Sequence, residues 1–243
     1  MVHVRAAHAK GRGSYGVRRI YAELSAEGLS VGRERVRRLM RLGGLQVTQS
    51  RRRRSIAPIA STFEAPNVLA RRFAAECPDV AWVADTTEFQ TGEGTLYLSA
   101  VLDLYARRVV GWSAGPSMHR SLAVGALESA LLARQPGPGL LHHSDRGSQY
   151  TSEDYLLVLT GHGAVASFSG RGQCLDNAVA ESFFGTLKDE LVRREHFASH
   201  EQAIAALAEW IDFYNHRRRH SRLGYRTPAE HEAAYHPANV LGT

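Results

Sequence analysis

The sequence is poor in cysteine and has no long apolar run, and both shortages exclude whole classes of protein. Only two cysteines occur in 243 residues, Cys77 and Cys174. They supply neither a disulfide framework nor the paired spacing of a structural zinc site. No apolar run reaches the roughly 20 residues that a membrane-spanning helix needs, and no signal-peptide pattern is present. We therefore expect a protein of the reducing cytoplasm.

Acidic residues are scarce in the first part of the chain. Residues 1–54 hold 14 Lys and Arg against 3 Asp and Glu, a net charge of +11, whereas residues 55–243 hold 16 against 21, a net charge of −5. A strongly basic segment joined to a mildly acidic body is typical of a module that binds a polyanion. A solvated basic surface is the plainer alternative.

The basic segment has the pattern of two short helices separated by a turn. Apolar residues recur at helical spacing from Val17 to Leu24, and Gly28 ends that pattern. A second apolar stripe, expected to be buried, consists of Val36, Leu39 and Met40. The other face of that helix carries Arg33, Arg35, Arg37, Arg38 and Arg41. A short helix, a turn and an arginine-rich second helix are typical of a helix-turn-helix that reads DNA. A helical hairpin with a charged face is the alternative.

Four consecutive arginines, Arg51, Arg52, Arg53 and Arg54, follow the predicted helices. We interpret them as a basic linker that contacts phosphates. The predicted organisation is a helix-turn-helix domain over 1–50, a linker over 51–75, a catalytic core over 76–232 and a C-terminal tail over 233–243, with the first domain and the body as separate units.

The body alternates strands and helices in a pattern typical of an α/β fold. Three strands with short connections are predicted over 82–89, 95–102 and 108–114, followed by a helix over 121–132. The order continues with a strand over 140–144 and a helix over 151–160 that has a Thr151–Asp154 capping box. It ends with a strand over 164–167 and two further helices. We expect a mixed five-stranded sheet flanked by helices, in which the first and fourth strands are neighbours.

Three carboxylates fall at positions where this fold would bring them together. Asp85 lies within the first strand, Asp145 ends the fourth, and Glu181 lies on a later helix for which Asp176 or Asn177 is the expected N-cap. Hard oxygen ligands from three such elements suit Mg²⁺ or Mn²⁺. Two ions held about 3.5–4 Å apart would serve an in-line phosphoryl displacement.

Five segments carry a resemblance to a known family: WVADTTEF, DLYARRVVGW, HSDRGSQYTS, DNAVAESFFGTLKDEL and FYNHRRRHSRLGYRTPAE. They resemble the second reading frame of insertion-sequence family-three transposases, whose core is retroviral-integrase-like and ribonuclease-H-like. The 35 residues between Asp145 and Glu181 are the spacing typical of that Asp-Asp-Glu class, and Lys188 matches the family's downstream basic residue. The resemblance covers residues 10–232.

The resemblance implies a DNA transposase that works in the bacterial nucleoid. Asp85, Asp145 and Glu181 would hold two Mg²⁺ ions, for which Mn²⁺ can substitute, and would cleave and join DNA strands at the ends of the element. Lys188 and Asn177 would contact end DNA near the scissile phosphate, and Arg146 would position phosphates or brace the Asp145 loop. Expected partners are double-stranded DNA, a second copy of the chain on DNA and, since family members usually work as a frameshift fusion, an upstream-frame product.

Other candidate sites have plainer interpretations. Asp103 is expected to accept backbone hydrogen bonds in a turn, and one of His142 and His143 must point inward, where core packing is its expected role. His216 and His220 are spaced for zinc, but the arginines between them favour phosphate contact or a solvated helix end. Cys174 is expected to be a small apolar side chain.

Two other functions remain open at this stage. A nuclease of the same fold would hydrolyse nucleic acid without joining it, although it would need no sequence-reading helix. A catalytically incomplete copy would act as a DNA-binding regulator.

The concentration of arginine in the first 54 residues predicts that DNA binding depends steeply on salt. Each phosphate contact contributes about −0.9 to the slope of log K against log salt concentration. We expect single substitutions of Arg35 or Arg38 by Gln to make the slope less negative by about one such step, measured by fluorescence anisotropy between low and physiological salt. A slope near zero would contradict a phosphate-binding role.

Overall fold

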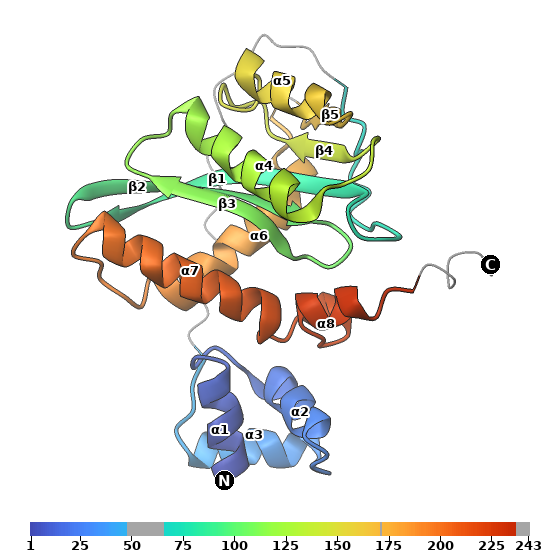
Figure 1. Cartoon of the computed structure of the whole chain (residues 1–243). Coiled ribbons are helices and arrows are strands. Elements are labelled where there is room, and N and C mark those ends of the chain that lie inside the picture. The colour runs from blue at the N-terminus through green and yellow to red at the C-terminus, as the bar shows by residue number, and fades with distance from the viewer. Residues whose placement is uncertain (48–65, 171, 237–243) are drawn as a thin grey trace.

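The structure is a computed structural model that describes residues 1–47, 66–170 and 172–236. The first part of the chain is helical, and the rest forms a mixed sheet with helices on both faces (Figure 1). This confirms the α/β class and the small helical domain expected before it. The predicted arginine linker at 51–54 lies outside the described residues. No helix in the described ranges is both long and apolar enough to cross a membrane.

The five strands occur in the predicted order along the chain. They are β1 (Ala81–Thr91), β2 (Gly94–Asp103), β3 (Val109–Gly115), β4 (Leu141–Ser144) and β5 (Val165–Phe168). Their order in the sheet is β3-β2-β1-β4-β5. The first three form an antiparallel meander, while β4 pairs in parallel with both β1 and β5. Strands β1 and β4 are therefore neighbours, as expected.

The helices are α1 (Val2–Lys10), α2 (Val17–Ala26), α3 (Arg33–Leu42), α4 (Arg120–Arg134), α5 (Glu153–Gly161), α6 (Ala178–Leu187), α7 (His200–His216) and α8 (Pro228–Ala233). The structure also has two short helical turns, η1 (Cys174–Asn177) and η3 (Ser221–Leu223), and one π-helical turn, η2 (Lys188–Val192). Helix α1 was not expected. The cap of α5 was predicted wrongly, because Ser152 rather than Thr151 accepts the capping hydrogen bond.

Two apolar clusters cover the two faces of the sheet. Trp82 and Ala84 of β1 pack with residues of α4 and α5, whereas Ala81 and Val83 pack with residues of α6 and α7. This alternation follows from the two-residue period of a strand. The close packing of α4 requires Gly111 on β3, because a Cβ atom there would lie 2.4 Å from the carbonyl oxygen of Ala126.

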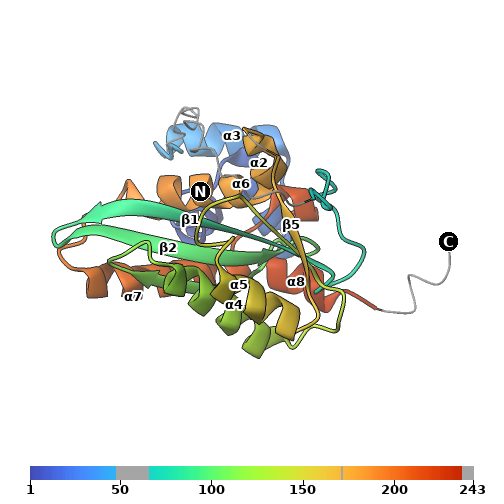
Figure 2. The ribbon, with the colours of Figure 1, turned by 90° about the horizontal axis from the view of Figure 1, so that it is seen from above.

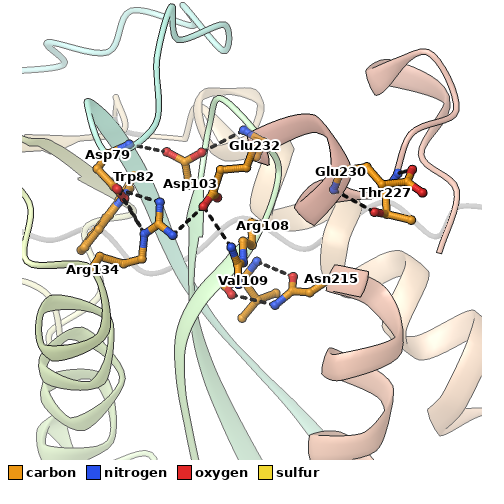
Figure 3. A network of polar contacts seen from close by, with 11 residues as sticks. Asp79, Trp82, Asp103, Arg108, Val109, Arg134, Asn215, Thr227, Glu230 and Glu232 are labelled. Atoms are coloured by element: carbon orange, nitrogen blue, oxygen red, sulfur yellow. Dashed lines mark hydrogen bonds and ion pairs between the residues drawn. The ribbon is translucent and has the colours of Figure 1, made fainter. Parts of the chain in front are cut away.

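A polar network closes the end of the sheet beside α8 (Figure 3). Arg134, at the end of α4, donates to Asp79 at 2.6 Å and to Glu232 at 2.7 Å, and Arg108 donates to the same Glu232 oxygen at 2.9 Å. Because Glu232 belongs to α8, this network fastens the C-terminal helix to the sheet.

The carboxylate of Asp103 organises the adjacent turn. It accepts hydrogen bonds from the backbone N–H groups of Asp79 at 3.1 Å and Ala106 at 2.8 Å. This is the turn role expected from the sequence. Burial raises the pKa of Asp103 to about 6. The two hydrogen bonds favour the charged form and lower the pKa, but their effect is smaller than that of burial.

The helical head, which we define as α1–α3 (residues 1–45), packs against the body rather than standing apart from it. Apolar residues of the head belong to the same cluster as α6 and α7, including Val4, Ile20 and Val36. Both views place the head on the side of α6, away from α4 and α5 (Figures 1 and 2). In the described residues the head therefore buries apolar surface on the body, and the division of the chain into domains stays a prediction.

Both histidines of β4 are buried, although only one was expected to be. The Nε2 atom of His142 lies 3.1 Å from the Tyr155 hydroxyl, and the ring nitrogens of His143 lie 2.9 and 3.1 Å from the hydroxyls of Ser167 and Ser169. Apolar clusters cover both faces of the sheet, so side chains on either side of β4 are shielded from solvent. Burial lowers the pKa of His142 to about 3 and that of His143 to about 4.

The low pKa of His142 predicts a loss of stability in mild acid. The unfolded chain takes up a proton near pH 6.5, whereas the folded chain does so only near 3, so stability falls as the pH drops below 6.5. Between pH 7.5 and 5.0 we expect this residue to remove about 2 kcal/mol from the free energy of unfolding. Urea unfolding of His142→Gln should show a correspondingly shallower pH dependence. His3→Gln, at an exposed position, is the control, and equal slopes for parent and His142→Gln would contradict the assignment.

Candidate catalytic site

Asp85 lies near the middle of β1, on the face that α6 covers. Side chains alternate along the strand, so Asp85 shares a face with Ala81 and Val83, which pack with α6 and α7. One carboxylate oxygen accepts a hydrogen bond from the backbone N–H of Thr86 at 2.8 Å. The strand therefore directs an acidic group beneath the helix that carries Glu181.

Asp145 directly follows β4, which pairs in parallel with the strand that carries Asp85. The register matches Ala81 with Leu141 and Val83 with His143. Continued for two more residues, this register would set Asp145 level with Asp85 and on the same face. Asp145 accepts a hydrogen bond from the backbone N–H of Gly147 at 2.9 Å.

Glu181 lies in the first turn of α6, which is anchored by its apolar face. Phe183 and Phe184 are buried, and the Phe183 ring packs edge-on against Tyr214 of α7, with ring centroids 5.1 Å apart. The helix runs directly into η2, and Lys188 is the first residue of that π-helical turn. Glu181 and Lys188 therefore belong to one continuous helical segment.

The three acidic groups influence one another electrostatically. The pKa of Asp85 is raised to about 8, first by burial, then by the charge of Asp145, with a further contribution from Glu181. Burial also raises the pKa of Asp145. The pKa of Lys188 is lowered by burial, which the charges of Glu88 and Asp85 oppose. The structure thus places three carboxylates and one ammonium group within electrostatic reach.

The side chains present are of the chemical type that binds a divalent cation, but they are not gathered into a complete set of metal ligands. Carboxylate oxygens are the ligands that Mg²⁺ and Mn²⁺ prefer, and a cation would relieve the repulsion that raises the pKa of Asp85. In the part of the chain that the structure describes, no three acidic, histidine or cysteine side chains are gathered as a metal-binding group. The ligand assignment of Asp85, Asp145 and Glu181 stays a prediction.

Asn177 is placed to hold the site together rather than to face solvent. Its side chain is 4% exposed, and its Nδ2 atom donates to the carbonyl oxygen of Ala84 at 3.0 Å. Ala84 immediately precedes Asp85, and Asn177 precedes Glu181 by about one helical turn. The contact therefore ties the start of α6 to β1. In this conformation the Asn177 side chain does not reach the surface where the sequence analysis expected a DNA contact.

Asp176 forms a brace that the sequence analysis missed. Asp176 and Asn177 were the two expected N-caps of α6. Asn177 stands at the N-cap position, but neither side chain makes a capping hydrogen bond to the helix. Asp176 instead accepts hydrogen bonds from Arg71 at 2.6 Å, Asn67 at 2.8 Å and the backbone N–H of Gly170 at 2.9 Å. Because Asn67 and Arg71 lie about a hundred residues earlier, no local pattern could reveal this contact.

Arg146 supports the loop that follows Asp145. Its Nε atom donates to the carbonyl oxygen of Ser169 at 2.8 Å, which joins the loop to the residue after β5. This geometry agrees with the bracing role, one of the two expected from the sequence. Contact of Arg146 with phosphate stays a prediction.

The five arginines expected to bind DNA all lie on α3 and are exposed: Arg33, Arg35, Arg37, Arg38 and Arg41. The guanidinium group of Arg33 lies 5.1 Å from the centre of the Tyr21 ring. Val36 and Met40 are buried, as predicted, whereas Leu39 of the same stripe is only partly buried. Arg51, Arg52, Arg53 and Arg54 lie outside the described residues.

Arg218 and Arg219, two of the three arginines between His216 and His220, are not free for phosphate contact, which was one of the two interpretations of this segment. Arg218 is 3% exposed and Arg219 is half-buried, and both make ion pairs within the protein. The pKa of His220 is lowered to about 3, first by burial and then by Arg218 and other nearby arginines. His216 is exposed and pairs with Asp212 at 2.9 Å, which agrees with a solvated helix end.

Comparison with protein families identifies the parts of the chain separately. Residues 1–54 match an HTH-like domain, and residues 75–174 and 162–228 match two models of an integrase core domain. The computed fold is similar to the HTLV-2 integrase catalytic core domain in complex with magnesium, with a TM-score of 0.53 over 65% of this chain and 98% of that one. At 15% sequence identity this similarity confirms the ribonuclease-H-like fold alone.

Several curated proteins are similar over most of their length. The insertion element IS600 uncharacterized 31 kDa protein of Shigella sonnei is 41% identical, over 97% of this chain and 87% of its own. The transposase for insertion sequence element IS629 of Shigella sonnei is 39% identical, with 91% and 75% covered. The transposase InsF for insertion sequence IS3A of Escherichia coli (strain K12) is 38% identical, with 94% and 80% covered.

The Asn177 contact predicts that this side chain stabilises the fold at the site. Asn177→Ala removes a buried hydrogen bond between α6 and β1, and should lower the free energy of unfolding by about 1–3 kcal/mol. Ser182→Ala, at an exposed position of the same helix, is the matched control and should change stability little. Urea unfolding monitored by circular dichroism would measure both. Equal stability of the two variants would contradict the tie.

Proposed function

Since the chain belongs to the insertion-sequence family-three transposases with an integrase core domain, we propose that it cleaves DNA strands at the ends of its element and transfers them to target DNA. The observation that carries this proposal is that Asp85 on β1 lies within electrostatic reach of both Asp145, directly after the neighbouring strand β4, and Glu181 on α6. That arrangement supports an Asp-Asp-Glu site for phosphoryl transfer.

Asp85, Asp145 and Glu181 would hold the divalent ions, with Mg²⁺ as the expected metal and two ions per site. When bound, such ions activate an attacking water or hydroxyl group and stabilise the leaving 3′-oxygen. Three carboxylates on separate elements supply oxygen ligands from different directions. The brace of Asp176 and the tie of Asn177 hold the elements that carry them.

The cationic side chains would position the DNA. Lys188 shares a helical segment with Glu181 and lies within electrostatic reach of Asp85, so its ammonium group can balance the charge of a phosphate beside the carboxylates. The exposed arginines of α3 would bind the end DNA and place its phosphates. Joining two ends also calls for at least two copies of the chain on DNA.

The proposal predicts that cleavage depends on a divalent metal and on Glu181. Purified protein would be incubated with labelled duplex ends of its own element and Mg²⁺, and nicked and joined strands would be resolved on a denaturing gel. We expect Glu181→Gln to reduce cleavage by roughly a hundredfold or more while retaining DNA binding, because the substitution removes a charged metal ligand and keeps the shape of the side chain. EDTA should abolish cleavage by the parent.

A matched control is Glu128→Gln, at an exposed position of α4 on the opposite face of the sheet. It should cleave and join like the parent. Cleavage without joining would favour a nuclease, and binding without any strand breakage, even with an added upstream-frame product, would favour a DNA-binding regulator. Equal activity of parent and Glu181→Gln would overturn the proposed site.

A further inference from the structure

We propose that contacts between the helical head and the end of α7 form a clasp that determines which phosphodiester is cut, relative to the sequence bound by α3. The clasp consists of Tyr15, Glu23, Glu190, Arg218 and Arg219. Its role in choosing the cut rests on the proposed function, whereas the fixed seat that it gives the head can be tested on DNA without any cutting.

The first part of the clasp is the hydroxyl group of Tyr15, whose side chain is completely buried. It donates to the carbonyl oxygen of Arg217 at 3.1 Å and accepts from the backbone N–H of Arg219 at 2.6 Å. These bonds join residues about 200 positions apart. Gly11 permits the close packing, because a Cβ atom there would lie 2.3 Å from the Tyr15 ring.

The second part is the carboxylate of Glu23 on α2, which is 1% exposed. It accepts from Nε of Arg219 at 2.7 Å and pairs with Lys10 of the head. Arg219 also donates to Glu230 of the body at 2.9 Å. Arg219 therefore stands between a carboxylate of the head and a carboxylate of α8.

The third part extends the clasp toward the candidate catalytic site. Arg218 donates two hydrogen bonds of 2.8 Å to the carboxylate of Glu190, and Arg19 of the head lies 3.8 Å from the same carboxylate. Glu190 belongs to η2, two residues after Lys188. The head is thus connected to the helical segment that carries both Glu181 and Lys188.

A clasp of buried ionic groups favours one relative position of head and body. Separating such a pair leaves a buried charge with neither its partner nor water to stabilise it, so partial opening of the clasp is unfavourable in free energy. The arginines of α3 remain exposed, since the clasp uses α1, α2 and the turn between them. A head held in one position on the body keeps α3 at a constant distance and orientation relative to Asp85, Asp145 and Glu181. Covalent connection through the chain does not by itself set that distance and orientation.

The test compares full-length Tyr15→Phe and Arg219→Gln with the parent on the same labelled end DNA. DNase I protection would map the head's part and the body's part of the footprint, and Mg²⁺ would then be added to map the nicks. We expect both variants to keep the head's footprint, to need roughly tenfold more protein to protect the body's part, and to spread nicks over neighbouring phosphodiesters. Tyr15→Phe removes only a hydroxyl group, so it serves if Arg219→Gln folds poorly.

The matched control is Arg217→Gln, which removes a positive charge from the same run at a side chain that is 56% exposed and pairs with Asp212. It should keep the parent's footprint and nick position. A parent-like footprint and a single parent-like nick in both clasp variants would overturn the clasp. If the parent protects both parts of the footprint but never nicks the DNA, the catalytic proposal fails. The footprints of parent and variants still test whether the clasp fixes the position of the head.

Discussion

The parallel pairing of β1 with β4 is the constraint on which the candidate site depends. A slip of one residue would turn Asp145 to the other face of the sheet, because side chains alternate along a strand. The observed register pairs Val83 with His143, two residues before Asp85 and Asp145, and α6 covers the face on which Val83 lies. Burial and the nearby like charges then raise the pKa of Asp85, which favours a bound cation or proton.

The segment formed by α6 and η2 links this site to the rest of the molecule. At its start, Asn177 is bonded to the strand residue before Asp85. At its end, Glu190 is paired with Arg218 after α7 and lies near Arg19 of the head. One helical segment therefore contacts the sheet, the residues after the last long helix and the helical head. A displacement of the head would act on the same segment that carries Glu181.

Much of the fold could be predicted because it depends on local patterns. Strand and helix periodicity predicted all five strands in order, and the short connections between the first three predicted their antiparallel pairing. Positions where long-range contacts compete with local ones were predicted less well. Asp176 was expected to cap a helix but binds Arg71, and the arginines after α7 were expected at the surface but bind Glu190 and Glu23.

The sequence by itself determined the family, the α/β order of elements, the basic character of the head and the identity of the three candidate carboxylates, because these depend on residue type, spacing and charge. Only the tertiary structure decided the roles of Asn177, Asp176, Arg218 and Arg219. Each of those side chains is bonded to a residue far away in the chain, and burial decides whether a charged or polar group faces a partner within the protein or a ligand outside it.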